Sequence, residues 1–415
     1  MSSLTLLHIS DMQFGRNHRF GRLGSPEPDA SFDSLPQRLI DDLKGLRDEH
    51  ALRPDALIVS GDLVEWGKRS EFNDAYEFLV RLTEFLELDR GRVAIVPGNH
   101  DINRTKCEAY FLHCKAEEQE PLAPYWPKWE FFVEMFQRFY QDVPGVHFSP
   151  DQPWTLFEMA ELKLAVAGLN STMVESHLDG THCGHLGETQ LRWFAKKLVH
   201  YEKHGRLRLG AVHHNVLRKA DADEENLKDA DDLTRWLGPK LNLLLRGHTH
   251  QARLDWLGRD LPVFSTGSAA LIDDALPDAP NQYQLLRLSA GTVERWTRCY
   301  DPGGKRWIAD TRLSENGNEW RTSHSITFHM ADAALRLRRV QKIPESIQLE
   351  SKGQKTLPST AESEQNTSPR LFPQSARGRL ASLVMWRGCV VLNRASWMSS
   401  SRISADCRPM SRCGK

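Results

Sequence analysis

The sequence of 415 residues contains no apolar run long enough to cross a bilayer and no Cys-x-x-Cys pair. A membrane-spanning helix needs about 20 consecutive apolar residues, so we expect no membrane association. The seven cysteines are scattered and odd in number, which argues against a disulfide framework. The N-terminus also lacks the basic segment of a secretory signal. These absences predict a protein of the reducing cytoplasm.

Most of the chain also lacks an excess of basic residues, although the net charge of −1 hides this. From Leu371 onward there are eight basic residues and one acidic residue, so this segment carries +7 and residues 1–370 carry −8. Nucleic-acid binding needs a basic surface that faces the phosphates. The acidic main body therefore argues against a nucleic-acid partner, and nothing in the sequence indicates an oligomeric state.

The residues that are present have the composition of a globular protein, with 40% hydrophobic and 26% charged residues. In the first hundred residues, short apolar runs alternate with segments of helical spacing. Strands are predicted at 4–10, 56–59 and 93–96, and helices at 35–49 and 70–88. The alternation of strand and helix predicts parallel strands joined by helical crossovers, and hence an α/β fold.

Beyond this point the sequence predicts one further region of the same fold, interrupted by an insertion. Residues 104–150 are rich in aromatic side chains and include a predicted helix at 127–141; they either cover a pocket as a lid or pack onto the core. Further elements are predicted at 154–159, 162–168, 186–203, 207–212, 230–237, 241–245, 252–257, 261–265, 283–288 and 292–298. We expect a domain over 1–300, an extension at 301–345 that packs on it, and a disordered, basic, low-complexity tail at 346–415.

Metal-ligating side chains follow five of the predicted strands, each where an apolar run ends. They are Asp11 with Gln13, Asp62 with Glu65, Asn99 with His100, His213, and His248 with His250. Because ligand sites gather at the carboxyl ends of strands in α/β proteins, these side chains can converge. Imidazoles and carboxylates suit Zn²⁺, Mn²⁺ and Fe²⁺. The donors are too many for one tetrahedral ion, which predicts two metals that hold a hydroxide and clamp both oxygens in a displacement at phosphorus.

Five motifs, in this order along the chain, resemble those of the calcineurin-like metallophosphoesterases. They are Asp11-x-Gln13, Gly61-Asp62, Gly98-Asn99-His100-Asp101, His213-His214 and Gly247-His248-Thr249-His250. The resemblance covers roughly residues 4–300. It implies a four-layer αββα sandwich of two mixed β-sheets flanked by helices. It also implies an enzyme that cleaves a phosphomonoester or phosphodiester bond with a metal-bridging hydroxide.

Carried over position by position, the resemblance gives the metal ligands. Asp62 would bridge the two ions. Asp11 and His250 would bind one of them. The other would be held by Asn99, His213 and His248.

The resemblance also suggests residues that act on the substrate. His100 would face the phosphate and protonate the leaving oxygen, and Glu65 could orient His100 by accepting its second N–H. His214 is expected to line the pocket on the substrate side. Asn170, at a strand end, could bind the substrate through a hydrogen bond, or could serve only in a turn.

Gln13 departs from the family pattern, which has a histidine at this position. A glutamine carbonyl oxygen can ligate, but it is a weaker and harder donor than imidazole. We expect looser occupancy of that metal and a preference for Mn²⁺ over iron or zinc. The alternative is that Gln13 only lines the site and a water takes the ligand position.

Two other functions remain open on the sequence alone. One is a nuclease of the same superfamily, which would need a basic groove. The other is a non-catalytic, protein-binding scaffold with a degenerate metal site, for which Gln13 is the supporting feature. The substrate is expected to be selected by three loops at 16–33, 104–150 and 171–186, which no motif explains.

Overall fold

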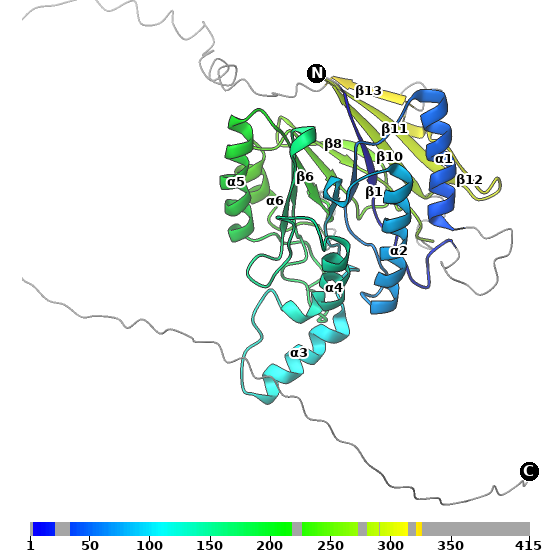
Figure 1. The fold of residues 1–415 in the computed structure, drawn as a ribbon. Coiled ribbons are helices and arrows are strands. Elements are labelled where there is room, and N and C mark those ends of the chain that lie inside the picture. Colours follow the sequence, from blue (N-terminus) through cyan, green and yellow to red (C-terminus); the bar gives the residue numbers. More distant parts are fainter. Residues whose placement is uncertain are drawn as a thin grey trace, which may run out of the picture. The chain divides into compact units, whose positions relative to one another are not determined.

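The computed structural model describes residues 3–20, 34–217, 226–272, 280–289, 291–313 and 321–325. Within them the chain forms two β-sheets with helices on their outer faces (Figure 1). Three predicted segments lie wholly outside the described residues: the part of the first selectivity loop at 21–33, the end of the extension at 326–345, and the tail at 346–415.

The first sheet is built around β1 and contains the three strands predicted first. In spatial order it consists of β12 (Arg306–Ala309), β11 (Thr292–Asp301), β10 (Gln282–Ser289), β1 (Leu4–Ile9), β2 (Ala56–Val59) and β3 (Val93–Ile95), with β13 (Arg321–Ser325) also paired to β11. The strands β1, β2 and β3 are parallel, with Leu6 opposite Ala56, whereas β10 to β13 are antiparallel. The predicted parallel crossover pattern is therefore confirmed.

The second sheet is also mixed. In spatial order it consists of β4 (Thr155–Met159), β5 (Leu164–Gly168), β6 (Leu207–Val212), β7 (Leu243–Arg246), β9 (Leu261–Ser265) and β8 (Arg253–Leu257). The four inner strands are parallel, and β4 and β8 are antiparallel edge strands. The antiparallel pattern predicted for 252–257 and 261–265 holds between β8 and β9, but β9 also pairs in parallel with β7.

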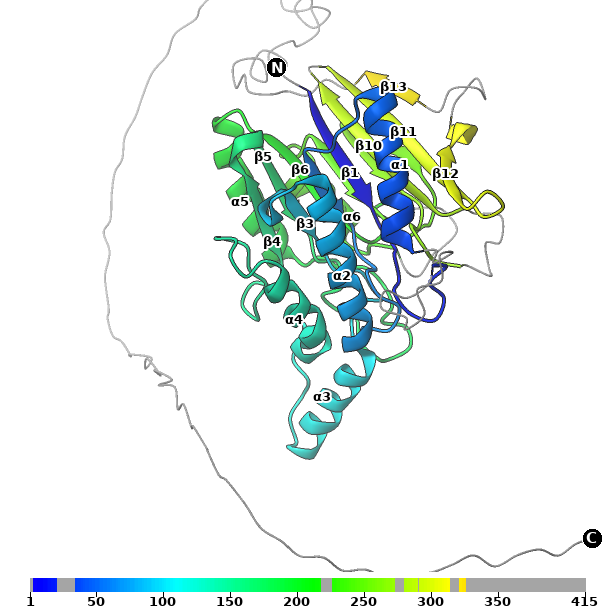
Figure 2. The same cartoon turned by 45° about the vertical axis from the view of Figure 1, so that its right-hand side comes forward.

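Side chains alternate along the strands of the second sheet, so its two faces pack into two different hydrophobic cores. This separates the layers of the fold. In β6, Leu209 and Ala211 pack into a core shared with the first sheet, whereas Val212 packs with α5 (Glu188–Lys203) and α6 (Ala230–Leu237). The outer face of the first sheet is covered by α1 (Leu35–His50) and α2 (Arg69–Leu86) (Figure 2). The result is the expected four-layer αββα arrangement.

The insertion between the two sheets contains two helices, α3 (Arg104–Ala116) and α4 (Glu130–Phe139). The predicted helix at 127–141 corresponds to α4 and to a preceding turn, η2 (Trp126–Trp129). Phe132, Phe136 and Phe139 are buried in the main core, so the aromatic side chains of this helix serve packing. The helix α3 was not predicted. The short 3₁₀ turns η1 (Arg90–Arg92), η3 (Ala160–Leu162) and η4 (Thr311–Leu313) complete the elements. None of the helices in the described ranges has both the length and the apolar character that crossing a membrane requires.

Candidate active site

The loops after β1 and β2 are joined by backbone hydrogen bonds, which extend the parallel pairing beyond the strands. The backbone N–H of Asp11 donates to the carbonyl of Gly61 at 3.0 Å, and that of Gln13 donates to the carbonyl of Asp62 at 3.0 Å. The carboxylates of Asp11 and Asp62 are thereby brought to one edge of the first sheet. Both side chains are buried, with at most 1% of their surface exposed.

Five of the predicted metal ligands have a left-handed backbone conformation. Their φ angles are 54° for Asp11, 43° for Gln13, 53° for Asp62, 70° for His248 and 50° for His250. Such a conformation costs a non-glycine residue about 1 kcal/mol or more. Its concentration at these five positions shows that the loops aim side chains at a common point at the expense of local backbone preference.

The loop after β3 approaches Asp62 so closely that only glycine fits at position 98. A Cβ atom there would overlap the Asp62 side chain and the ring of His213. The loop is held by Asp101, whose carboxylate accepts from the N–H of Gly98 at 2.8 Å and from that of Val64 at 3.1 Å. Burial and the nearby charge of Asp62 raise the pKa of Asp101 well above its usual value. Asp101 thus fixes the loop that carries Asn99 and His100.

The donors of three residues converge on one side of the centre, which we call the His213 side: Asn99, His213 and His248. The Oδ1 of Asn99 lies 2.9 Å from Nε2 of His213 and 3.2 Å from Nδ1 of His248, and the two imidazole nitrogens are 3.3 Å apart. The Oδ2 of Asp62 is 3.2 Å from the same Nε2 of His213. Atoms that share an ion at about 2.1 Å are separated by similar distances.

The orientation of His213 is fixed by the protein backbone. Its Nδ1 donates to the carbonyl of Ser60 at 2.8 Å, and because a carbonyl can only accept, Nε2 is the nitrogen available as a ligand. Burial lowers the pKa of His213, but the carboxylates of Asp62 and Asp11 outweigh this and raise it to about 10. The site thus favours a positive charge at Nε2, where a metal ion would supply it.

The opposite side, which we call the His250 side, consists of Asp11, Gln13 and His250. The Nε2 of His250 lies 3.3 Å from Oδ1 of Asp11. No described residue donates a hydrogen bond of good geometry to this buried oxygen. The amide nitrogen of Gln13 donates to Oδ2 of Asp62 at 3.3 Å.

Across both sides, Asp11, Asp62 and His213 each offer a ligand atom, all within 4.8 Å of one another. Together with an unsatisfied, buried carboxylate oxygen and several imidazoles, these donors fit divalent metal ions. The four residues Asn99, His100, His248 and His250 are only partly buried, so the centre opens to solvent on this face.

His100 is oriented by Glu65, but not by the predicted atom. The Nδ1 of His100 donates to the main-chain carbonyl of Glu65 at 2.8 Å, and its backbone N–H donates to Oδ1 of Asp62 at 2.9 Å. The Glu65 carboxylate instead accepts from the backbone N–H and the side-chain amide of Asn17, both at 2.9 Å. The prediction for the carboxylate is therefore wrong, because Asn17 captures it in the loop after β1.

The two predicted substrate-binding residues are fully buried and engaged by the protein. His214 contacts Oγ of Ser171 at 2.7 Å and Oε1 of Glu175 at 3.0 Å. The amide of Asn170 accepts from the N–H and the hydroxyl of Thr172 and donates to a backbone carbonyl. In this arrangement neither side chain has exposed surface with which to meet a substrate. Asn170 serves in a turn, which was the alternative to substrate binding. The ring of His214 packs against that of His248.

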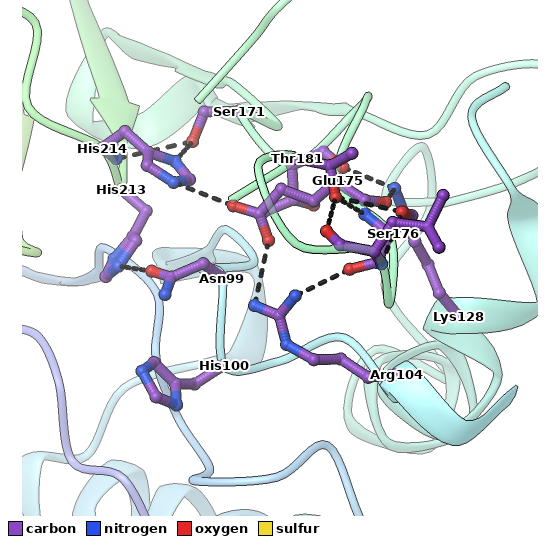
Figure 3. Close-up of polar contacts among 12 residues, drawn as sticks. Asn99, His100, Arg104, Lys128, Ser171, Glu175, Ser176, Thr181, His213 and His214 are labelled. Atoms are coloured by element: carbon purple, nitrogen blue, oxygen red, sulfur yellow. Dashed lines mark hydrogen bonds and ion pairs between the residues drawn. The ribbon is translucent and has the colours of Figure 1, made fainter. Parts of the chain in front are cut away.

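The structure also brings charged residues to the site that the sequence did not single out. Glu175, Arg104 and Lys128 lie in one cluster with His214 (Figure 3). They come from a loop and from the insertion, and they are far apart in the sequence. No spacing pattern relates them, so sequence reasoning had no signal for this cluster.

Comparisons with known proteins agree with these motifs. The sequence model described as calcineurin-like phosphoesterase matches residues 4–252. A glycerophosphodiester phosphodiesterase, GpdQ, of Enterobacter lignolyticus is 34% identical over 100 residues, which are 24% of this chain and only 30% of that protein.

Among solved structures, the fold of a dimetal phosphatase from Danio rerio is similar to that of this chain, with a TM-score of 0.45. The two sequences are 14% identical, and the match covers 74% of this chain and 98% of that chain. The structure of PhoD is also similar, with a TM-score of 0.44 and 12% sequence identity, and the match covers 73% of this chain and 68% of that chain. Since the family match spans more than half of the sequence, the chain belongs to the calcineurin-like phosphoesterase family.

Proposed function

We propose that the protein is a dinuclear, Mn²⁺-dependent phosphohydrolase that cleaves phosphodiester or phosphomonoester bonds. The observation that carries this proposal is the convergence of Asn99, His213 and His248 with Asp62, next to a second group of donors around Asp11. A glycerophosphodiester phosphodiesterase among the relatives supports a diester substrate.

The chain offers a separate set of donors for each of two ions. Asp62 lies between the sets and is suited to bridge, since Oδ2 is close to both His213 and Gln13. When bound, two such ions supply the Lewis-acid charge that activates a water and neutralises phosphate oxygens. In this structure the amide nitrogen of Gln13 donates to Asp62, so the amide would have to turn to present its oxygen to an ion. A hard amide oxygen in place of an imidazole would then favour Mn²⁺ on the His250 side.

His100 is the residue placed to handle the proton of the leaving group. Its Nδ1 donates to the Glu65 carbonyl, so on this partly exposed ring Nε2 is the nitrogen that no described residue engages. A protonated Nε2 can donate to the departing oxygen, and a positioned acid of this kind contributes about 100-fold or more to a rate. The backbone N–H of His100 on Asp62 ties this acid to the bridging carboxylate.

The test is the release of p-nitrophenol from bis-p-nitrophenyl phosphate by the full-length chain loaded with Mn²⁺. We expect Asp62→Asn to lose both bound metals and about 1,000-fold or more in kcat, because one carboxylate serves both ions. His100→Ala should keep its metals and lose about 100-fold. His200→Ala, an exposed histidine on α5, is the matched control and should behave as wild type. A metal-loaded wild type that hydrolyses neither diesters nor monoesters would favour the scaffold function instead.

A further inference from the structure

A cluster of buried charges lies beside the metal centre and takes no part in the proposed chemistry (Figure 3). The side chains of Glu175 and His214 are fully buried, and Lys128 is 1% exposed. Burying charged groups costs several kcal/mol unless they are paired and hydrogen-bonded. The contacts of this cluster indicate which segments next to the active site it holds in place.

Lys128 fixes the loop that carries Glu175. Its Nζ donates to the carbonyl of Thr172 at 2.6 Å and to that of Glu175 at 2.7 Å. The neighbouring Trp129 donates from Nε1 to the hydroxyl of Thr172 at 3.1 Å. The turn η2 of the insertion is therefore bonded directly to this loop, and the position of Glu175 is determined by both.

The carboxylate of Glu175 joins the metal centre to the insertion. On one side Oε1 lies 3.0 Å from Nε2 of His214, whose ring packs against that of His248 with 4.8 Å between centroids. On the other side Oε2 lies 3.8 Å from Nη2 of Arg104, the first residue of α3. One buried carboxylate thus faces a neighbour of a metal ligand and a guanidinium.

Arg104 is held by a backbone carbonyl but remains partly exposed to solvent. Its Nη1 donates to the carbonyl of Ser176 at 2.7 Å, while 32% of its side chain remains exposed. A purely structural pair would be expected to form two short hydrogen bonds to the carboxylate, whereas the 3.8 Å separation from Glu175 is too long for one. In the view of Figure 3 the guanidinium lies between Glu175 and the loop that carries Asn99 and His100. Only three residues separate His100 from Arg104, and one of them, Asp101, fixes the loop between them.

We propose that Arg104 binds a phosphate oxygen of the substrate and that Glu175 is the positioning residue that holds it there. The inference rests on the proposed function and adds a specificity-determining residue to it. The planar guanidinium presents several N–H donors in a fixed fork that matches phosphate geometry. Because Ser176 and Glu175 already restrain it, little side-chain entropy is lost when an anion binds.

The experiment measures binding of inorganic phosphate to the Mn²⁺-loaded full-length chain by calorimetry, together with KM and kcat for bis-p-nitrophenyl phosphate. Arg104→Ala should weaken phosphate binding and raise KM by about 10-fold or more, with a smaller change in kcat, since a charged hydrogen bond is lost. Arg104→Lys should recover part of the affinity, because it restores the charge but not the fork. Glu175→Gln should give an intermediate loss. Arg69→Ala, which removes an exposed arginine paired with Glu134, is the matched control.

Phosphate affinity within twofold of wild type in Arg104→Ala, at equal metal content, would overturn the inference and leave the proposed function intact. A loss of bound Mn²⁺ in this variant would also overturn it, because Arg104 would then act through the metals. If Arg104→Ala does not fold, Arg104→Lys takes its place, and a phosphate affinity of that variant within twofold of wild type at equal metal content would overturn the inference. A wild type that is inactive on every ester but binds phosphate through Arg104 would refute the proposed function alone.

Discussion

The His213 side and the His250 side of the centre differ in how firmly the fold positions their donors. On the His213 side, a backbone carbonyl fixes His213, and every donor lies within 3.3 Å of another. On the His250 side, all three residues have left-handed backbones, against His248 alone among the three on the other side. The one contact of the Gln13 amide among the described residues is to Asp62 at 3.3 Å. In the proposed dinuclear centre, the fold itself would therefore assemble the metal site on the His213 side, whereas the site on the His250 side would depend more on the ion to complete it.

The largest effect that separates the two sides is expected from removing one imidazole from each. His213→Ala deletes contacts to Asp62, Asn99 and Ser60, and should cost about 1,000-fold in kcat even at saturating Mn²⁺. His250→Ala should cost about 100-fold and recover in part at high Mn²⁺, because Asp11 and Asp62 remain. Metal content by mass spectrometry and kcat against Mn²⁺ concentration check both variants. Equal losses with equal Mn²⁺ rescue would show that the two sides do not differ.

A smaller effect concerns the buried charge behind the His213 side. Burial raises the pKa of Glu175 from 4.5 to about 7, although Arg104 and Lys128 lower it and His214 also faces it. The folded state therefore binds more protons than the unfolded state between these values, so this group makes stability fall as pH rises from about 4.5 to 7.

Glu175→Gln removes that titration. Between pH 5 and pH 8 the variant should gain up to about 3 kcal/mol in free energy of unfolding relative to wild type. Urea unfolding of both proteins at the two pH values measures this difference, and Glu158→Gln, a surface carboxylate on β4, is the control. The same wild-type-to-variant difference at both pH values would contradict the assigned pKa shift.

The smallest effect is expected from strengthening the weaker side. Gln13→His replaces a hard amide oxygen with an imidazole and should tighten the second metal by about 10-fold, with a shift in preference from Mn²⁺ toward Zn²⁺. Activity at saturating Mn²⁺ should change by less than about 10-fold, because the other donors are unchanged. Titration of the metal-free protein with each ion is the measurement. Unchanged affinity and preference would mean that a water, and not residue 13, is the ligand.

The sequence predicted those parts of the molecule that depend on local pattern. A buried parallel strand such as β2 is a continuous apolar run, and polar residues after it must lie at a strand end. The element order and the convergence of Asp11, Asp62 and His213 followed from this. The helix α3 was missed because its only buried residues are Cys107 and Cys114, which leaves no apolar stripe of helical period.

The details of the loops could not be predicted, because they depend on which partner captures each polar group. Glu65 lies three residues after Asp62 and reaches His100 as expected, but Asn17 takes its carboxylate and leaves the carbonyl for the imidazole. The position of Glu175 depends on contacts with the insertion and with His214 in the loop after β6, and no local pattern encodes them.

The most direct test of a dinuclear centre with unequal sides is a calorimetric titration of the metal-free, full-length protein with Mn²⁺. We predict two ions per chain, bound in two resolved steps, of which only the weaker changes in Gln13→His. A single ion per chain would contradict the dinuclear centre, and two equivalent ions that both respond to Gln13→His would contradict the difference between its sides.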